Sequence, residues 1–152
     1  MSTLTETIPD LTVQLDDGRE VQLSELAGGG YLVVFFYPKA FTGGCTAQAC
    51  HFRDLGAEFA ELGASRVGVS RDDLETQARF SAAHGFDFPL IADRDGSVAK
   101  AFGAKRMGPI PSKRQTVVLG PDLRVLLRIS SETNMDVHAD DALAYLREQQ
   151  AD

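Results

Sequence analysis

The chain has 152 residues, of which 43% are hydrophobic and 24% charged, and its formal net charge is -7. This length suits one domain, and no apolar run approaches the roughly 20 residues of a membrane-spanning helix. The acidic balance, without a lysine or arginine cluster, argues against nucleic acid or another polyanion as a partner. The first ten residues hold neither a basic segment nor the apolar stretch of a secretory signal. We therefore expect a cytoplasmic, reducing location.

No repeat, linker or low-complexity tract divides the sequence, which predicts a single domain over residues 1–152 with a flexible tail at 1–7. Residues 11–15 and 21–23 alternate apolar and polar positions around a turn that contains Gly18. This pattern predicts an N-terminal β-hairpin.

A short helix is expected from Ser24, followed by an apolar segment at residues 31–37 with the sequence YLVVFFY. Its length and its β-branched and aromatic content are typical of a central strand covered on both faces. From Cys45 the apolar spacing becomes helical, in a stripe made of Phe52, Leu55, Phe59 and Leu62. The stripe predicts one helix that ends near Gly63.

The second half of the chain continues the alternation of strands and helices. Expected strands lie at residues 66–70, 88–91, 115–120 and 124–130, the second of them edge-like and the last two forming a hairpin. Expected helices run from Asp72 or Asp73 to about His84, over residues 97–102, and along Ala139, Ala142, Leu143 and Leu146. Together these elements predict an α/β fold with helices on both faces of a central mixed sheet.

The two cysteines, Cys45 and Cys50, follow the predicted central strand. A permanent disulfide is not expected in a reducing compartment, and taken by number alone the two thiols would be buried small hydrophobes. The setting of Cys45 favours chemistry instead. A cysteine in the first turn of a helix faces free backbone N–H groups and the positive end of the helix dipole, and both favour the thiolate.

The residues before Cys45 have the spacing P-x-x-x-T-x-x-C, with Pro38 and Thr42 at the two other fixed positions. The Thr42 hydroxyl can approach the sulfur or a bound oxygen, and Pro38 can wall one side of a pocket. Gly43 and Gly44 place no side chains beside the sulfur, so backbone amides can donate hydrogen bonds to a small ligand. Each residue alone is more often an ordinary strand end, N-cap or loop. The occurrence of all these residues together, directly before Cys45, is what indicates a catalytic site.

At these residues the sequence resembles the bacterioferritin-comigratory, or Q-type, branch of the peroxiredoxins. The resemblance lies in FYPKAFT at residues 36–42 and CTAQAC at 45–50. It extends to HFRD at 51–54, VGVS at 67–70, FPLIAD at 88–93 and KRQT at 113–116. It thus spans nearly the whole chain.

The resemblance implies a thioredoxin-like fold and a thiol peroxidase for hydrogen peroxide and organic hydroperoxides. Cys45 would become a sulfenic acid, and Cys50 would resolve it as an intramolecular disulfide. Arg114 would reach the sulfur from a neighbouring strand and complete a catalytic pocket with Pro38 and Thr42; the substrate would bind at Thr42, Gly44, Cys45 and Arg114. Thioredoxin or a similar thiol protein would supply the electrons.

Two positions depart from the pattern of this branch. Gly43 replaces a common proline, so we expect a more mobile loop. Gln48 stands where a glutamate is common, which removes a charge that would help to hold an arginine in place.

The spacing of the cysteines raises a geometric problem. Two residues five apart in a regular helix have Cα atoms about 8.6 Å apart. A disulfide needs a separation below about 7 Å. If Cys45 and Cys50 share one helix, we therefore predict that its first turn or two unwinds before the disulfide forms. An intramolecular disulfide requires no second subunit, which favours a monomer over a dimer.

Three alternative functions fit the sequence less well. A metal site at Cys45, Cys50 and His51, with His84 or His138, fits none of the common zinc spacings, so we expect no metal and place the three histidines on the surface. A thioredoxin-like dithiol-disulfide oxidoreductase normally has C-x-x-C, whereas four residues intervene here. A non-enzymatic binding module of the same fold would not need Thr42 or Arg114.

No cofactor is expected either. The glycines at residues 28–30 lack the G-x-G-x-x-G form of a nucleotide-binding loop and precede a strand instead of following one. The electrons therefore have to come from a separate protein.

Overall fold

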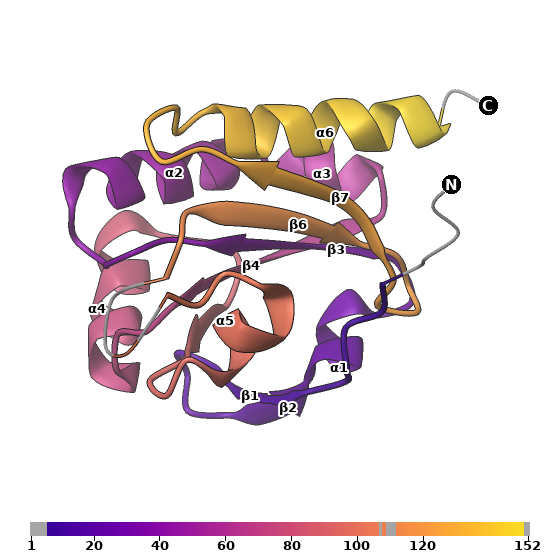
Figure 1. Ribbon diagram of the computed structural model, residues 1–152. Coiled ribbons are helices and arrows are strands. Elements are labelled where there is room, and N and C mark those ends of the chain that lie inside the picture. The colour runs from indigo at the N-terminus through magenta and orange to yellow at the C-terminus, as the bar shows by residue number, and fades with distance from the viewer. Residues whose placement is uncertain (1–5, 107, 109–111, 151–152) are drawn as a thin grey trace.

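The computed structural model describes residues 6–106, 108 and 112–150. Its centre is a five-stranded mixed sheet with the order β5-β4-β3-β6-β7 (Figure 1). The strands are β3 (Tyr31–Phe36), β4 (Ala64–Ser70), β5 (Leu90–Ala92), β6 (Gln115–Leu119) and β7 (Val125–Ser130). The first three are parallel, whereas β6 and β7 are antiparallel to their neighbours. A separate hairpin pairs β1 (Thr12–Gln14) with β2 (Glu20–Gln22), as predicted.

The helices cover both faces of this sheet, which confirms the predicted fold class. They are α1 (Leu23–Ala27), α2 (Gly43–Asp54), α3 (Gly56–Glu61), α4 (Leu74–His84), α5 (Ser97–Phe102) and α6 (Val137–Gln150). Figure 1 shows α2, α3 and α6 on one face, and α1, α5 and the hairpin on the other. Within the described residues, no helix is long and apolar enough to cross a membrane.

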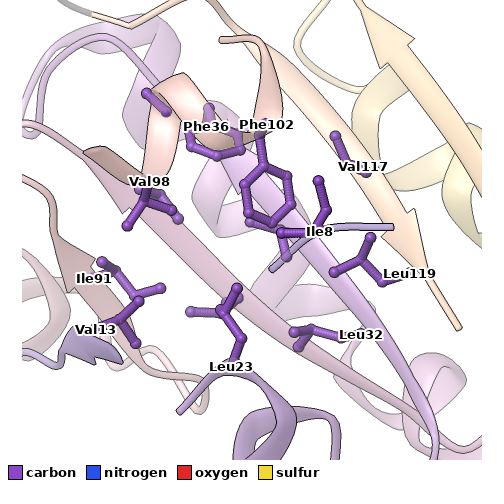
Figure 2. Close-up of a cluster of buried hydrophobic side chains, with 14 of the residues drawn as sticks. Ile8, Val13, Leu23, Leu32, Phe36, Ile91, Val98, Phe102, Val117 and Leu119 are labelled. Atoms are coloured by element: carbon purple, nitrogen blue, oxygen red, sulfur yellow. The ribbon is translucent and has the colours of Figure 1, made fainter. Parts of the chain in front are cut away.

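Strand β3 is the common wall of two hydrophobic cores. Its alternate residues Leu32, Val34 and Phe36 pack into the core under α1 and α5 (Figure 2). Val33 and Phe35 pack into the opposite core, which also contains residues of α2, α3, α4 and α6. Burial on both faces explains the continuous apolar run, because period-2 alternation disappears when both faces are covered. The buried strand places the loop before α2 at one edge of the sheet.

The predicted single helix from Cys45 to about Gly63 is wrong, because the chain breaks into α2 and α3 at Leu55. A Cβ atom added at Gly56 would lie 2.8 Å from Asp87 Oδ2 and 3.0 Å from Arg66 Nη2. These two side chains therefore press against the backbone at the break. The apolar spacing continues across it, so periodicity alone could not locate the end of α2.

Two residues of the predicted flexible tail are bound to the sheet. Residues 1–5 of the expected tail lie outside the described residues, but the prediction is wrong for Glu6 and Thr7. Glu6 accepts two hydrogen bonds from Arg128 at 2.7 Å, and its carbonyl oxygen accepts one from the Val125 N–H. Thr7 forms a β-bridge with Arg124. Both residues are thus tied to the end of the sheet.

His138 is fully buried, which corrects its predicted surface position. Its Nε2 lies 2.9 Å from the Ser131 carbonyl oxygen, and its Nδ1 lies 2.8 Å from Thr116 Oγ1. A carbonyl only accepts, so Nε2 carries the proton and the neutral ring accepts the Thr116 hydroxyl at Nδ1. Burial, the largest cause, lowers the pKa of His138, and the nearby Arg114 lowers it further. A neutral imidazole therefore joins α6 to β6.

This geometry predicts acid sensitivity. Because the pKa of His138 is lower in the folded chain than its ordinary 6.5, its contribution to stability is present above that value and is lost as pH falls below it. Between about pH 7.5 and pH 5.5 we expect a loss of less than about 1.5 kcal/mol from this residue. Urea titrations at the two pH values measure it. The His138→Gln protein should lose less stability over the same interval, and an equal loss in both proteins would contradict the assignment.

Candidate active site

Cys45 is the third residue of α2 and lies just beyond the carboxyl end of β3. Its side chain is only 1% exposed. Thr42 is the N-cap residue, and the loop before it is held by a hydrogen bond from the Ala40 N–H to Asp72 Oδ2 at 2.8 Å. Cys45 therefore lies in the first turn of the helix, where backbone N–H groups are free, as predicted.

Two donors approach the sulfur. The backbone N–H of Lys39 and the Nη1 of Arg114 each lie 3.5 Å from Cys45 Sγ. Arg114 is 6% exposed and immediately precedes β6, the neighbour of β3. A guanidinium and a backbone amide therefore point at one buried sulfur. The structure thus brings Cys45 and Arg114 together, as the resemblance implied.

Gln48 holds the arginine in place. Its Oε1 accepts a hydrogen bond from Arg114 Nη1 at 2.6 Å, and the side chain is fully buried. Residues three apart lie on the same side of a helix, so Gln48 and Cys45 meet the same guanidinium nitrogen. As expected, this position lacks the charge of a glutamate, and a neutral amide oxygen makes the contact with Arg114 instead.

Gln48 and Arg114, whose side chains meet beside Cys45, each have a buried N–H group without an acceptor in the described residues. Among the described residues, Gln48 Nε2 and Arg114 Nε are buried without a hydrogen-bond partner. Buried donors normally find a partner, which can also be water or a ligand. These groups can therefore donate to an oxygen-containing molecule that enters the site.

The other predicted site residues surround this centre more loosely. The exposed Thr42 hydroxyl donates to the Lys39 carbonyl oxygen at 2.7 Å, so its proton is not directed at the sulfur. Pro38 is half-buried at the end of β3, directly before the amide that contacts Sγ. Gly44 lies against Arg114 and Met135, since a Cβ there would be 3.2 Å from Arg114 Nη2 and 3.1 Å from Met135 Cε.

The sequence did not predict three groups that help to form the site. They are the Lys39 backbone amide, Glu132 and Met135. Glu132 Oε2 accepts the Arg114 N–H at 3.0 Å and pairs with Arg106 at 3.2 Å. Glu132 and Met135 belong to a segment between β7 and α6 that has no apolar period, so no sequence pattern placed them beside α2. Together they fix the backbone of Arg114 and cover the start of the helix.

Cys50 lies in the same continuous helix as Cys45, is half-buried, and both thiols are free in this structure. The condition for predicted unwinding is therefore met. The unwinding itself stays a prediction.

His51 and His84 contact residues other than Cys45 and Cys50. His51 Nε2 bonds to Asp140 Oδ1 at 2.7 Å, and His84 packs between Phe80 and Phe86. Over the described part of the chain, no three histidine, cysteine or carboxylate side chains are grouped as metal ligands.

Comparison with known proteins gives a consistent set of relatives. The model of the AhpC/TSA family matches residues 4–127. The solved structure of peroxidoxin BcpB from Mycobacterium tuberculosis is 50% identical, has a TM-score of 0.91 and covers 95% of this chain and 96% of its own. Peroxiredoxin Bcp of Xanthomonas campestris is 35% identical over 91% of this chain and 89% of its own length.

A solved structure of the bacterioferritin comigratory protein of Xanthomonas campestris is described for its alkyl peroxide reduction activity. It is 34% identical to this chain, with a TM-score of 0.83, and the match covers 93% of this chain and 96% of that one.

The two glycines before Cys45 give a matched pair of variants. Gly44→Ala adds a methyl group against Arg114 and Met135, whereas a Cβ at Gly43 meets nothing within 4 Å. Because a displaced guanidinium no longer points at the sulfur, we expect Gly44→Ala to react with hydrogen peroxide roughly tenfold more slowly. Gly43→Ala should react at nearly the wild-type rate. Stopped-flow measurement of the second-order rate constant tests both, and equal rates for the two variants would contradict the role of this contact.

Proposed function

The chain belongs to the AhpC/TSA family of peroxiredoxins, and from this premise we propose that Cys45 is the residue that reacts with peroxide in a thiol peroxidase. One observation carries the assignment. Arg114 Nη1 and the Lys39 N–H both lie 3.5 Å from Cys45 Sγ, and the Cys45 side chain is only 1% exposed. The same donors can serve the sulfur before the reaction and the departing oxygen during it.

In the first step the Cys45 thiolate attacks the terminal oxygen of a hydroperoxide, ROOH. The S–O bond forms as the O–O bond breaks, and the second oxygen leaves with the electron pair, takes a proton and becomes ROH. Cys45 is oxidised to the sulfenic acid and the peroxide is reduced. Negative charge grows on the departing oxygen, so donors fixed around it lower the barrier most. Arg114 and the amides of the first turn, including that of Gly44, are suited to this role. The Thr42 hydroxyl joins them only if it turns away from the Lys39 carbonyl oxygen, to which it donates in this structure.

In the second step the Cys50 thiol attacks the Cys45 sulfur. The S–S bond forms, and the sulfenic hydroxyl leaves as water with the thiol proton. Both cysteines lie in α2, and a regular helix holds their Cα atoms about 8.6 Å apart, so the first two turns have to open. Cys45 and Cys50 are the proposed redox disulfide.

In the third step a dithiol protein reduces the disulfide by thiol exchange and is itself oxidised. We propose thioredoxin or a similar thiol protein as this donor, and the reducing cytoplasm as the location that supplies it. Hydrogen peroxide and organic hydroperoxides are the proposed substrates, in line with the alkyl peroxide activity named for the Xanthomonas campestris protein. The disulfide closes within one chain, so a monomer is the proposed catalytic unit.

The alternative, a thioredoxin-like dithiol-disulfide oxidoreductase, fits the site less well. Exchange with a protein disulfide requires an accessible attacking sulfur. Cys45 is 1% exposed and fixed between Arg114 and the Lys39 amide. A small peroxide can reach such an atom more easily than a protein disulfide can.

Treatment with peroxide tests the proposal directly. Reduced protein given one equivalent of hydrogen peroxide should rapidly lose both free thiols and the mass of two hydrogen atoms. Cys45→Ser should be inert, whereas Cys50→Ser should stop at a sulfenic acid or form a disulfide between two chains. Thiol titration and intact mass give the answer. Wild-type thiols that survive minutes of exposure would overturn the proposed function.

Helix propensity offers a test of the opening step. Gly43→Ala favours the helical state by up to about 1 kcal/mol, so the disulfide should form roughly fivefold more slowly from the sulfenic acid. Ala47 is exposed in the same helix. The opposite change, Ala47→Gly, should accelerate the step by a similar factor. Rapid-quench mass spectrometry follows the conversion, and unchanged rates in both variants would mean that α2 need not open.

A further inference from the structure

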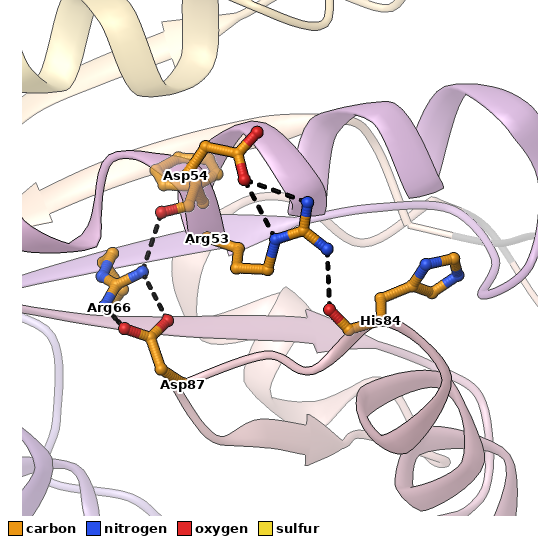
Figure 3. A network of polar contacts seen from close by, with 6 residues as sticks. Arg53, Asp54, Arg66, His84 and Asp87 are labelled. Atoms are coloured by element: carbon orange, nitrogen blue, oxygen red, sulfur yellow. Dashed lines mark hydrogen bonds and ion pairs between the residues drawn. The ribbon is translucent and has the colours of Figure 1, made fainter.

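The last turn of α2 is held much more firmly than its first two turns. The Phe52 ring is fully buried and stacks on Phe35 with centroids 4.2 Å apart. The Phe52 carbonyl oxygen accepts a hydrogen bond from Arg66 Nη1 at 2.7 Å. Arg53 Nη1 donates to the carbonyl oxygen of His84, at the end of α4, also at 2.7 Å (Figure 3). The turn is therefore attached to β3, β4 and α4.

Arg66 is the centre of this attachment. Its side chain is 8% exposed and makes two hydrogen bonds to Asp87, at 3.0 and 2.8 Å (Figure 3). Its guanidinium carbon also lies 5.0 Å above the centre of the Phe88 ring. The hydrogen bonds from Arg66 are the main cause that lowers the pKa of Asp87, so this carboxylate stays charged at neutral pH. The arginine is thus fixed on three sides while it holds α2.

The glycine at the end of α2 makes room for this arrangement. Gly56 has none of the positive φ values that would require glycine. Its Cβ would lie 2.8 Å from Asp87 Oδ2 and 3.0 Å from Arg66 Nη2. The position therefore needs glycine because the ion pair approaches its backbone.

The first two turns have no comparable support. Residues 43–50 bury only Cys45, Gln48 and Ala49, and two of them are small. Within the described residues, their side-chain hydrogen bonds to the rest of the protein come from Arg114 and from the Lys39 amide. This part of α2 is therefore the part that can open at low cost.

The structure assigns Arg66 as a positioning residue for the resolving step, an inference that rests on the function proposed above. When residues 43–50 unwind, residues 51–54 remain as a single helical turn, and an isolated turn is not stable in water. Arg66 supplies the missing support by binding the Phe52 carbonyl oxygen. Unwinding then stops at His51, so Cys50 stays anchored beside the intact turn while the segment that carries Cys45 moves towards it.

Loss of this support should change the second chemical step and spare the first. In Arg66→Met the side chain keeps its length but loses its donors, so unwinding continues towards Leu55 and Cys50 becomes mobile. Because a mobile partner has a lower effective concentration, we expect disulfide formation from the sulfenic acid to slow by about five- to tenfold. The reaction of Cys45 with hydrogen peroxide should stay within about twofold of wild type, since the first turn of α2 is untouched.

Hydrogen exchange locates the end of the unwound segment. On oxidation of the wild type, the amides of residues 46–54, whose acceptors are the carbonyl oxygens of residues 42–50, should lose protection, whereas the Leu55 amide, which donates to the His51 carbonyl oxygen, should keep it. In oxidised Arg66→Met, the loss should extend to residue 55. A merely stabilising role of Arg66 would lower global stability without moving this boundary. Arg66→Lys, which keeps a charge and one donor direction, should restore part of both effects.

Two further variants keep the test decisive. Asp87→Asn removes the ionic partner of Arg66 and should give a weaker form of the same phenotype if Arg66→Met does not fold. Arg19→Met removes an exposed arginine paired with Asp17 at 2.7 Å, and it should change neither step.

The possible failures can be told apart. A wild-type protein that forms no disulfide with peroxide would overturn the proposed function. A wild type that forms it, with the Leu55 amide unprotected after oxidation, would overturn the role of Arg66 alone. A wild-type rate and boundary in Arg66→Met would do the same.

Discussion

A single nitrogen atom of Arg114 connects the central sheet to the start of α2. Its Nη1 lies 3.5 Å from Cys45 Sγ and 2.6 Å from Gln48 Oε1. This contact depends on the strand order, because β6 pairs with β3 and places Arg114 across from the end of the central strand. The backbone of Arg114 is fixed in turn by Glu132, and the segment carrying Glu132 is held by buried His138. The thiol environment is thus built by elements far apart in the sequence.

The same helix has to satisfy two opposing demands. Reaction with peroxide requires a fixed thiol, since donors stabilise the departing oxygen only where they are already in place. Disulfide formation requires that thiol to leave its pocket. The fold separates these demands along α2: polar contacts to Arg114 hold the first turns, whereas the buried Phe52 and its bonded carbonyl hold the last. When the helix opens, water can replace the lost polar contacts, so their loss costs little free energy. Exposing the buried Phe52 ring to water has no such compensation.

Local patterns predicted the elements that carry this arrangement. The apolar run of β3 and the cap and stop of α4 at Asp73 and Gly85 follow from short-range chemistry. The pairing of Arg114 with Cys45 came from the resemblance, because the two residues are 69 positions apart. What could not be predicted depends on tertiary packing. The break at Leu55 lies beside an ion pair between β4 and a distant loop, and the buried His138 is bonded to Thr116 of another strand.

An amide in place of a carboxylate at Gln48 changes the balance between holding the thiol for reaction with peroxide and releasing it for disulfide formation. A carboxylate at this position, common in the branch that the sequence resembles, would form a buried, charge-assisted pair with Arg114. Such a pair is shorter and stronger than a neutral hydrogen bond, and breaking a buried pair leaves a charge without its partner. The amide orients the same guanidinium nitrogen at 2.6 Å without a second charge. Opening of α2 then costs a hydrogen bond instead of an ion pair, and Gly43, which favours the unwound chain, acts in the same direction. The two departures from the branch pattern thus weaken only the end of the helix that has to open, while the last turn keeps its support from Arg66.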